Sequence, residues 1–136
     1  MNRCGYTRNR AACLVASLLL WPGLHNIAYA GDGSHPLTLN LGDYRFVPDR
    51  MDVTAGQPVI LVLVNKDGMT PHNFTLQDEQ AGLDLDVDVS AGQTAGVNFT
   101  PATAGSYSFY CNKKLPFMKS HRDRGMWGRL VVNEAR

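Results

Sequence analysis

One stretch of the chain contains three side-chain types that bind soft metal ions. Cys111, His121 and Met126 lie within sixteen residues and supply a thiolate, an imidazole and a thioether. A second imidazole is available at His72, which lies elsewhere in the sequence. Two histidines and a cysteine with a weak axial methionine form the ligand combination of blue-copper electron-transfer sites, because soft sulfur stabilises Cu(I) and imidazole suits Cu(II). The four residues therefore predict a mononuclear copper site.

Each of these residues also has an interpretation without copper. A buried cysteine is often a small inert residue, and a single histidine is often part of a core or a turn. Zinc is the main alternative ion, although structural zinc sites usually contain more cysteines and do not use a thioether. Within the same loop, Met118 competes with Met126 for the axial position, unless Phe117 and Met118 only pack over the site.

These side chains must be positioned by β-strands, because short apolar or alternating runs recur between glycines and prolines and no window has a helical period. Alternation places Cys111 on the same face as Phe109, at a strand end, and His72 on the same face as Phe74. Both candidate ligands should therefore point inward. Eight strands at this spacing predict an all-β Greek-key sandwich or barrel. The expected strands are 37–41, 50–54, 59–65, 72–77, 83–89, 94–99, 106–111 and 128–133.

The segment 83–89 alternates aspartates with leucines and valines. Three carboxylates in one segment can indicate a calcium site. Alternation, however, places them in a row along one solvated face of a strand. We therefore expect a strand with an apolar inner face and an acidic outer face.

Length and charge limit the number of domains and the class of partner. A chain of 136 residues suffices for one domain and is short for two. Its net charge is +1 and 18% of its residues are charged, which argues against a nucleic-acid-binding protein and against a disordered acidic chain. The cysteines Cys4, Cys13 and Cys111 form neither a CxxC pair nor a disulfide framework. Cysteine chemistry must then come from single thiols.

The first thirty residues have the pattern of a secretory signal peptide. Three arginines precede an apolar run at 11–21, and Ala28-Tyr29-Ala30 matches the small-x-small site of signal peptidase. The run is about half of the roughly 20 apolar residues that a membrane anchor needs. We expect cleavage before Gly31 and a single domain at 31–136 with no membrane span. Ten basic and twelve acidic residues then remain, for a net charge of −2.

The residues around the candidate ligands resemble those of the cupredoxin family. Pro71-His72-Asn73-Phe74 is similar to the upstream histidine motif of plastocyanins and azurins, and Phe109-Tyr110-Cys111 with Gly125-Met126 is similar to their ligand loop. The resemblance extends over residues 37–135 and implies a cupredoxin fold. It implies that Asn73 ties the two ligand-bearing loops together. It also implies equatorial copper ligands at His72, Cys111 and His121 and an axial ligand at Met126.

The loop length distinguishes this chain from the small cupredoxins. Nine residues separate Cys111 from His121, a spacing similar to the type 1 site of copper nitrite reductases. Those enzymes have a histidine immediately before the cysteine as a ligand of a second, catalytic copper, whereas Tyr110 occupies that position here. The chain also lacks the His-Cys-His bridge of multicopper oxidases and the second cysteine of a copper-A centre. The resemblance therefore implies an electron carrier and not an enzyme.

We expect a periplasmic, monomeric carrier that passes one electron at a time through one copper ion. A copper-tolerance protein with the same ligands is the alternative, and a ligand-free adhesion sandwich is a third hypothesis. Basic residues surround the apolar segment 115–118 of the ligand loop, and this pattern favours a redox partner with an acidic docking surface. The basic residues are Lys113, Lys114, Lys119, Arg122, Arg124 and Arg129, opposed only by Asp123.

Overall fold

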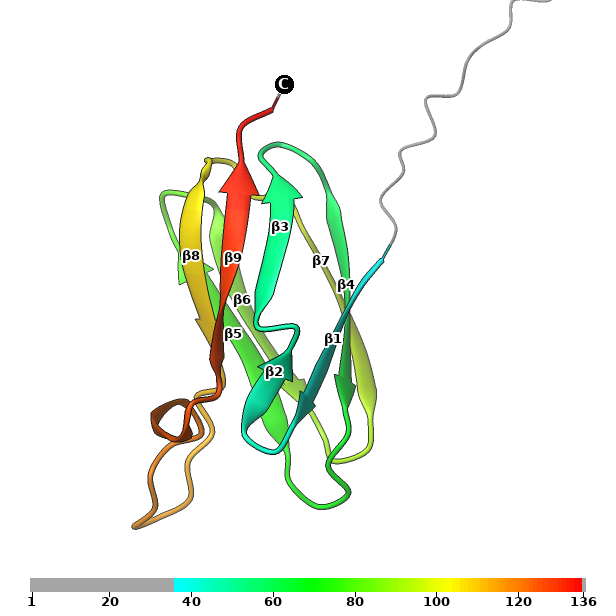
Figure 1. The fold of residues 1–136 in the computed structure, drawn as a ribbon, viewed down its shortest axis with the longest axis vertical. Coiled ribbons are helices and arrows are strands. Elements are labelled where there is room, and N and C mark those ends of the chain that lie inside the picture. Colours follow the sequence, from blue (N-terminus) through cyan, green and yellow to red (C-terminus); the bar gives the residue numbers. More distant parts are fainter. Residues whose placement is uncertain (1–35, 136) are drawn as a thin grey trace, which may run out of the picture. The chain divides into compact units, whose positions relative to one another are not determined.

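A computed structural model of the chain describes residues 36–135. These residues form nine strands and one short 3₁₀ helix, arranged as two sheets (Figure 1). The signal peptide expected at 1–30, with Cys4 and Cys13, lies outside the described residues, so cleavage before Gly31 stays a prediction. Between residues 36 and 135, no helix is long and apolar enough to cross a membrane.

The first sheet contains four of the described strands in the order β2-β1-β4-β7. Strand β1 pairs in parallel with β4, and the other two pairings are antiparallel. A two-residue turn, Asp43-Tyr44, joins β1 to the short β2. The bounds are Leu37–Gly42 for β1, Arg45–Val47 for β2, Val59–Asn65 for β4 and Thr94–Phe99 for β7.

The second sheet contains the other five described strands in the order β3-β9-β8-β5-β6. Strands β3 and β9 are parallel, and the remaining pairs are antiparallel. The 3₁₀ helix η1, Arg122–Arg124, lies in the long connection between β8 and β9. The bounds are Arg50–Thr54 for β3, His72–Asp78 for β5, Leu83–Val89 for β6, Gly105–Tyr110 for β8 and Trp127–Asn133 for β9.

The predicted all-β sandwich is confirmed, with one correction to the strand count. Each of the eight expected strands is present, and their ends differ from the prediction by at most one residue. The ninth strand, β2, was missed because three residues are too few for an alternating pattern. Asp43 and Tyr44 both have positive φ (49° and 55°), so the β1–β2 turn has a hairpin geometry that usually requires glycine or asparagine. Without those residues the turn gave no signal in the sequence.

The inner faces of the two sheets share one apolar core. Alternate residues of β1 and β4 are buried. The rings of Phe74 and Phe109 face them from the second sheet and are also buried. The ring centroids of Phe46 and Phe109 are 5.1 Å apart, and those of Phe74 and Phe109 are 5.3 Å apart. Cys111 and Met126 belong to the same buried cluster. These two candidate ligands are therefore packed against the hydrophobic core.

Strands β8 and β9 approach each other closely at Gly128. A Cβ atom on Gly128 would overlap the ring of Phe109, its cross-strand partner, and would lie 2.5 Å from the carbonyl oxygen of Asp49. Glycine is therefore required for this approach. Phe109 is two residues before Cys111, so the close approach also fixes the end of the strand from which Cys111 follows.

Candidate metal centre

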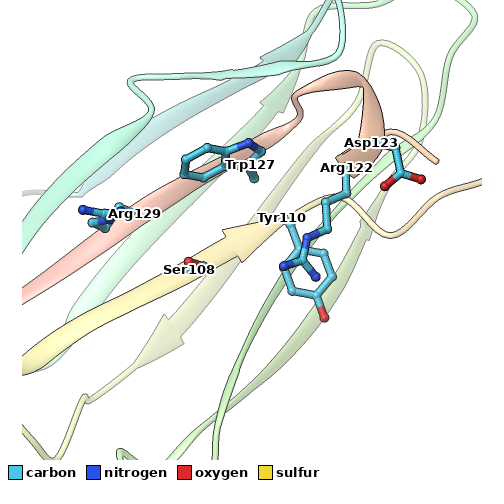
Figure 2. A pocket seen from close by; sticks show the side chains of 6 residues that line it. All are labelled: Ser108, Tyr110, Arg122, Asp123, Trp127 and Arg129. Carbon is cyan, nitrogen blue, oxygen red and sulfur yellow. The ribbon is translucent and has the colours of Figure 1, made fainter. Parts of the chain in front are cut away.

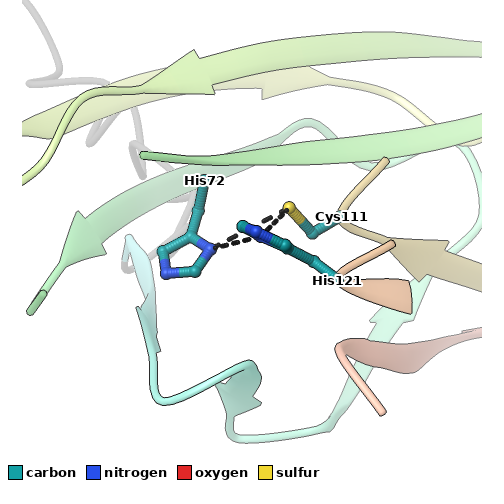
Figure 3. A group of neighbouring side chains, drawn as sticks. All are labelled: His72, Cys111 and His121. Carbon is teal, nitrogen blue, oxygen red and sulfur yellow. Dashed lines mark hydrogen bonds between the residues drawn. The ribbon is translucent and has the colours of Figure 1, made fainter. Parts of the chain in front are cut away.

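The three predicted equatorial ligands come together at one end of the sandwich. His72 begins β5, Cys111 directly follows β8, and His121 directly precedes η1. Their ligand atoms all lie within 4.8 Å of one another, and all three residues are buried (Figure 3). Within residues 36–135 they form the only cluster of three or more histidine, cysteine or acidic residues with this geometry. The structure thus joins residues that are up to 49 positions apart.

Both histidines turn Nδ1 toward the thiol. The two Nδ1 atoms are 3.1 Å apart, and Cys111 Sγ lies 3.3 Å from Nδ1 of His121 and 3.9 Å from Nδ1 of His72. Imidazole nitrogen and thiolate sulfur bind first-row metal ions at roughly 2.0–2.3 Å. Donors at these separations leave room for one such ion between them. A trigonal set of two nitrogens and one sulfur is the donor set of blue-copper sites.

A carboxylate that sequence analysis did not single out holds the far side of the His72 ring. Asp67 Oδ2 lies 2.7 Å from Nε2 of His72, whose side chain is fully buried. Asp67 belongs to the β4–β5 connection, five residues before the histidine. The only sequence signal was an acidic residue in a glycine-containing turn, which is too common to indicate a site.

Asn73 joins the two ligand-bearing segments, and its hydrogen bonds confirm the predicted tie. Its Oδ1 accepts the backbone N–H of Asn112 at 2.9 Å, and its Nδ2 donates to Asn112 Oδ1 at 2.9 Å. The backbone N–H of Asn73 points at Cys111 Sγ across 3.4 Å. Since an N–H donor stabilises a thiolate, this contact favours the metal-binding form of the cysteine.

The acidic outer face of β6 has a further role beyond the predicted one. Its aspartates are exposed, as expected from the alternation. Asp86, however, accepts hydrogen bonds from the side chains of Asn73 at 2.6 Å and Asn112 at 3.3 Å. Asp88 forms an ion pair with Lys113 at 2.6 Å. The acidic face of β6 therefore supports the start of the ligand loop. The sequence predicted only that its aspartates are exposed to solvent.

Backbone hydrogen bonds close the base of the loop that runs from Cys111 to Met126. The N–H of Cys111 donates to the carbonyl of Met126 at 3.1 Å, and the N–H of Met126 donates to the carbonyl of His121 at 3.0 Å. Two more bonds join His121 to Lys113 at 2.9 Å and Arg122 to Cys111 at 3.1 Å. The backbones of three predicted ligands are thus fixed to one another, independently of the loop tip.

The two candidate axial methionines differ in environment. Met126 is fully buried, and its backbone is bonded to both Cys111 and His121. Met118 is 43% exposed and lies near the loop tip. A weak axial ligand must be close to the trigonal donors, and the burial of Met126 suits that position better. The axial assignment stays a prediction.

Tyr44 packs against the histidines from the β1–β2 turn. Its ring is nearly perpendicular to both imidazoles, with centroids 4.9 Å from His121 and 6.3 Å from His72. The guanidinium of Arg124 lies 4.5 Å from the centroid of the same ring. A positive φ is unusual for a bulky residue and persists where surrounding contacts hold it. We attribute the conformation of Tyr44 to these contacts.

Burial sets the protonation of the thiol and of one imidazole. Burial raises the pKa of Cys111, and the N–H of Asn73 only partly opposes this shift. Burial also lowers the pKa of His121, and the neighbouring His72 and Arg124 lower it further. At neutral pH the imidazole of His121 is therefore neutral and able to bind a metal, whereas a metal that binds Cys111 must displace a proton.

Comparison with known proteins assigns the family. The family model of the cupredoxin-like domain matches residues 11–127, and the chain therefore belongs to the cupredoxin-like family. No curated protein matches the chain significantly.

Solved structures share the fold at low sequence identity. An auracyanin from the photosynthetic bacterium Roseiflexus castenholzii is 18% identical, with 72% of this chain and 96% of that chain covered and a TM-score of 0.58. Auracyanin A from Chloroflexus aurantiacus, described as a "blue" copper protein, is 24% identical, with 73% and 100% covered and a TM-score of 0.55. The metal-binding domain of the Cu(I)-exporting ATPase CopA of Streptococcus pneumoniae, solved with Cu(I), is 14% identical, with 73% and 85% covered and a TM-score of 0.54.

The cupredoxin fold and the buried His-Cys-His set support one copper ion as the cofactor. Cys111 is the only cysteine among residues 36–135, which does not suit the cysteine-rich structural sites of zinc. The ligand-free sandwich is also disfavoured, because His72 and His121 direct the same ring nitrogen toward one sulfur atom.

Proposed function

We propose that this protein is a carrier of single electrons and not an enzyme. In the proposed site, His72, Cys111 and His121 hold one copper ion, with Met126 as the axial ligand. The observation that carries the proposal is the convergence of the three trigonal donors, all of them buried, at one end of the sandwich. When bound, copper supplies a one-electron couple, because thiolate and imidazole ligands suit both Cu(I) and Cu(II).

The surrounding chain keeps the ligands in nearly fixed positions during electron transfer. His72 is attached to β5 and bonded to Asp67 on its far side. Cys111 receives the N–H of Asn73, and His121 lies inside the closed base of the ligand loop. Ligands that move little between the two oxidation states lower the reorganisation energy of each electron transfer.

We propose that electrons enter and leave at His121. This residue is 7% exposed, whereas His72, Cys111 and Met126 are completely buried. His121 also lines a surface pocket whose other walls come from Tyr44, the β4–β5 connection and the ligand loop. The edge of its imidazole therefore offers the shortest electron-transfer path from the metal to a partner protein at the surface.

The partner that suits this surface is a redox protein with an acidic docking face. Three exposed apolar side chains surround this site. Met69 and Leu115 line the same pocket as His121, and Phe117 lies further along the ligand loop. Lys114 and Lys119 are exposed cations of the same loop. An apolar centre with a cationic rim favours brief, electrostatically steered encounters with an acidic protein.

Not all the basic residues of the loop are equally available for steering. Lys113 is paired with Asp88. Arg124 lies over Tyr44, and Arg122 lies 4.3 Å from the ring centroid of Tyr110, on the outer face of β8 (Figure 2). Arg129 lies in β9 and not in the loop, so Lys114 and Lys119 are the cations that we assign to steering.

We also propose that the carrier is exported to the periplasm as a monomer. The support is the signal-peptide pattern at 1–30, with its small-x-small site at Ala28-Tyr29-Ala30. Intact-mass analysis of the exported protein should give Gly31 as the first residue. Retention of Met1 on a membrane-embedded protein would contradict the export proposal.

Addition of Cu(II) to the purified copper-free protein tests the carrier function. We expect an intense visible band from thiolate-to-copper charge transfer and a reversible one-electron couple in voltammetry. If the protein binds Cu(I) tightly but has no Cu(II) band and no reversible couple, the copper-tolerance alternative is favoured. If it binds neither ion, the proposed copper site is wrong.

A further inference from the structure

We propose that Asp67 is a positioning residue of the copper site, which fixes the nitrogen that His72 offers to the metal and favours Cu(II) over Cu(I). The proposal rests on the proposed copper function. Its basis is the contact of 2.7 Å between Asp67 Oδ2 and Nε2 of His72. Within residues 36–135, no other group forms a hydrogen bond with this nitrogen.

The carboxylate of Asp67 is itself held in place by three neighbouring segments. Its Oδ1 accepts the backbone N–H of Asp43, in the β1–β2 turn, at 3.2 Å. The backbone N–H of Asp67 donates to Asn65 Oδ1 at 3.0 Å, and its carbonyl accepts the N–H of Gly92 at 2.8 Å. Asn65 is buried and in turn donates to the carbonyls of Thr70 and Val89. These bonds limit the positions available to the carboxylate and therefore to the ring that it holds.

A carboxylate in this position selects one tautomer of His72. A neutral imidazole has one N–H, and an ionised carboxylate can only accept a hydrogen bond. The proton therefore resides on Nε2, and the lone pair is on Nδ1, which faces Cys111. Among the described residues, Nε2 of His121 has no such partner. The two imidazoles thus differ, since His72 is anchored and His121 is left open toward the surface.

The negative charge of Asp67 also acts on the oxidation state of the copper. Hydrogen bonding of a ligand histidine to a carboxylate raises the basicity of the ligand. A more basic ligand and a nearby negative charge both stabilise Cu(II) more than Cu(I). Asp67 is only partly exposed, with 24% of its side chain accessible, so solvent screens this charge incompletely. Loss of the charge should therefore raise the reduction potential.

Two variants remove the charge and the acceptor oxygens of Asp67 in turn. Asp67→Asn removes the charge and keeps one oxygen, which can accept from His72 or from Asp43 but not from both, whereas Asp67→Ala removes both oxygens. Asp84→Asn is the matched control, because it removes an equal charge at the end of β6 opposite Val89, the residue that pairs with His72, and its carboxylate accepts a hydrogen bond from Gln77 and not from a ligand. The measurements are Cu(II) and Cu(I) affinity by competition, the reduction potential, and the tautomer of His72 in the copper-free wild type by ¹⁵N NMR.

We expect the Nε2–H tautomer of His72 in the copper-free wild type. Asp67→Asn should weaken Cu(II) binding by about 10- to 100-fold. Each tenfold loss of Cu(II) affinity relative to Cu(I) corresponds to a rise of about 59 mV in the potential. Asp67→Ala should have at least this effect, and Asp84→Asn should have little.

Either an Nδ1–H tautomer in the wild type or equal potentials for Asp67→Asn and Asp84→Asn would overturn the proposal. The tautomer measurement needs neither copper nor a variant that folds. If the wild type fails to bind copper, the proposed function is wrong, while the state of His72 still tests the role of Asp67. A wild type with a normal blue site that is indifferent to Asp67→Asn refutes only the positioning role.

Discussion

Each trigonal ligand has a second contact that fixes its direction. The imidazole of His72 is held by Asp67, the sulfur of Cys111 receives the N–H of Asn73, and the ring of His121 packs against Tyr44. These contacts come from different parts of the chain, so the donor geometry is a property of the fold and not of the ligand loop alone.

Replacement of Cys111 by serine tests the thiolate. Cys111→Ser should abolish the intense visible band, because a hydroxyl cannot supply the soft donor. The protein should stay folded, since serine is close to cysteine in size and can form hydrogen bonds with the nearby imidazole nitrogens. Absorbance after Cu(II) addition and far-UV circular dichroism measure the two effects. A variant that keeps the band would exclude Cys111 as a ligand.

The two methionines can be separated by their effect on the potential. Met126→Leu should keep the visible band and raise the reduction potential, because loss of an axial donor favours Cu(I). Met118→Leu is the matched control and should leave the potential unchanged, since Met118 is partly exposed near the loop tip. Voltammetry of both variants decides the assignment. A shift for Met118→Leu alone would transfer the axial role to Met118.

At the scale of the elements, the end of β8 is set by how closely it packs on β9. The ring of Phe109 occupies the space that a side chain at Gly128 would need. Cys111 follows two residues later, and its backbone is bonded to Met126, which directly precedes β9. Packing of the strand pair and placement of the ligands are therefore coupled.

Gly128→Ala should destabilise the fold by about 1–3 kcal/mol, because the added methyl group overpacks a closed site. Gly96→Ala is the matched control, since Gly96 also lies in a strand but has open space within 4 Å of the point where a methyl group would be added, and no positive φ. We expect that control to stay within about 0.5 kcal/mol of the wild type. Urea denaturation measures both free energies of unfolding. Equal values for the two variants would contradict the packing argument.

The strands were predictable because they are either alternating runs, as in β6, or short apolar runs between turn residues, as in β4. Alternation also predicted correctly that the side chains of His72 and Cys111 point into the protein. Strand β2 was not predictable, because it has three residues and follows a turn without glycine. The contact between Asp67 and His72 depends on the path of the β4–β5 connection, which alternation does not determine. Sequence patterns therefore indicated the donors but not the groups that orient them.

At the scale of the whole molecule, the hydrophobic core does not depend on the metal. Most of the buried apolar residues lie between the two sheets, and the candidate ligands occupy only one end of this core. Removal of copper should leave the β-sheet circular dichroism spectrum unchanged and lower the Tm, because a ligand that binds only the folded state stabilises it by mass action. Thermal unfolding with and without a chelator measures this. A copper-free protein without sheet structure would make folding dependent on the metal.

The basic rim should act on the rate of electron exchange. Lys114→Gln with Lys119→Gln should slow exchange with an acidic cytochrome at low salt, and the difference should shrink as salt rises, because the Debye length is about 8 Å at physiological ionic strength. The copper spectrum should be unchanged. Stopped-flow rates at several salt concentrations provide the measurement.

A charge-matched control separates local steering from net charge. Gln57→Glu with Gln80→Glu changes the net charge by the same amount, but in turns at the end of the sandwich where β9 finishes, away from the ligands. We expect this control to exchange electrons at nearly the wild-type rate. If both double variants slow the reaction equally, the loop lysines have no specific role.

Divergence among descendants of this protein should concentrate between residues 114 and 119. The four backbone hydrogen bonds between Cys111, Lys113, His121, Arg122 and Met126 hold the ligand geometry, and none of them involves this segment. Insertions, deletions and substitutions there can alter the surface without disturbing the metal. A lineage could thus acquire a new redox partner while it retains its potential and colour. The closed base makes the loop a module in which recognition evolves separately from electron chemistry.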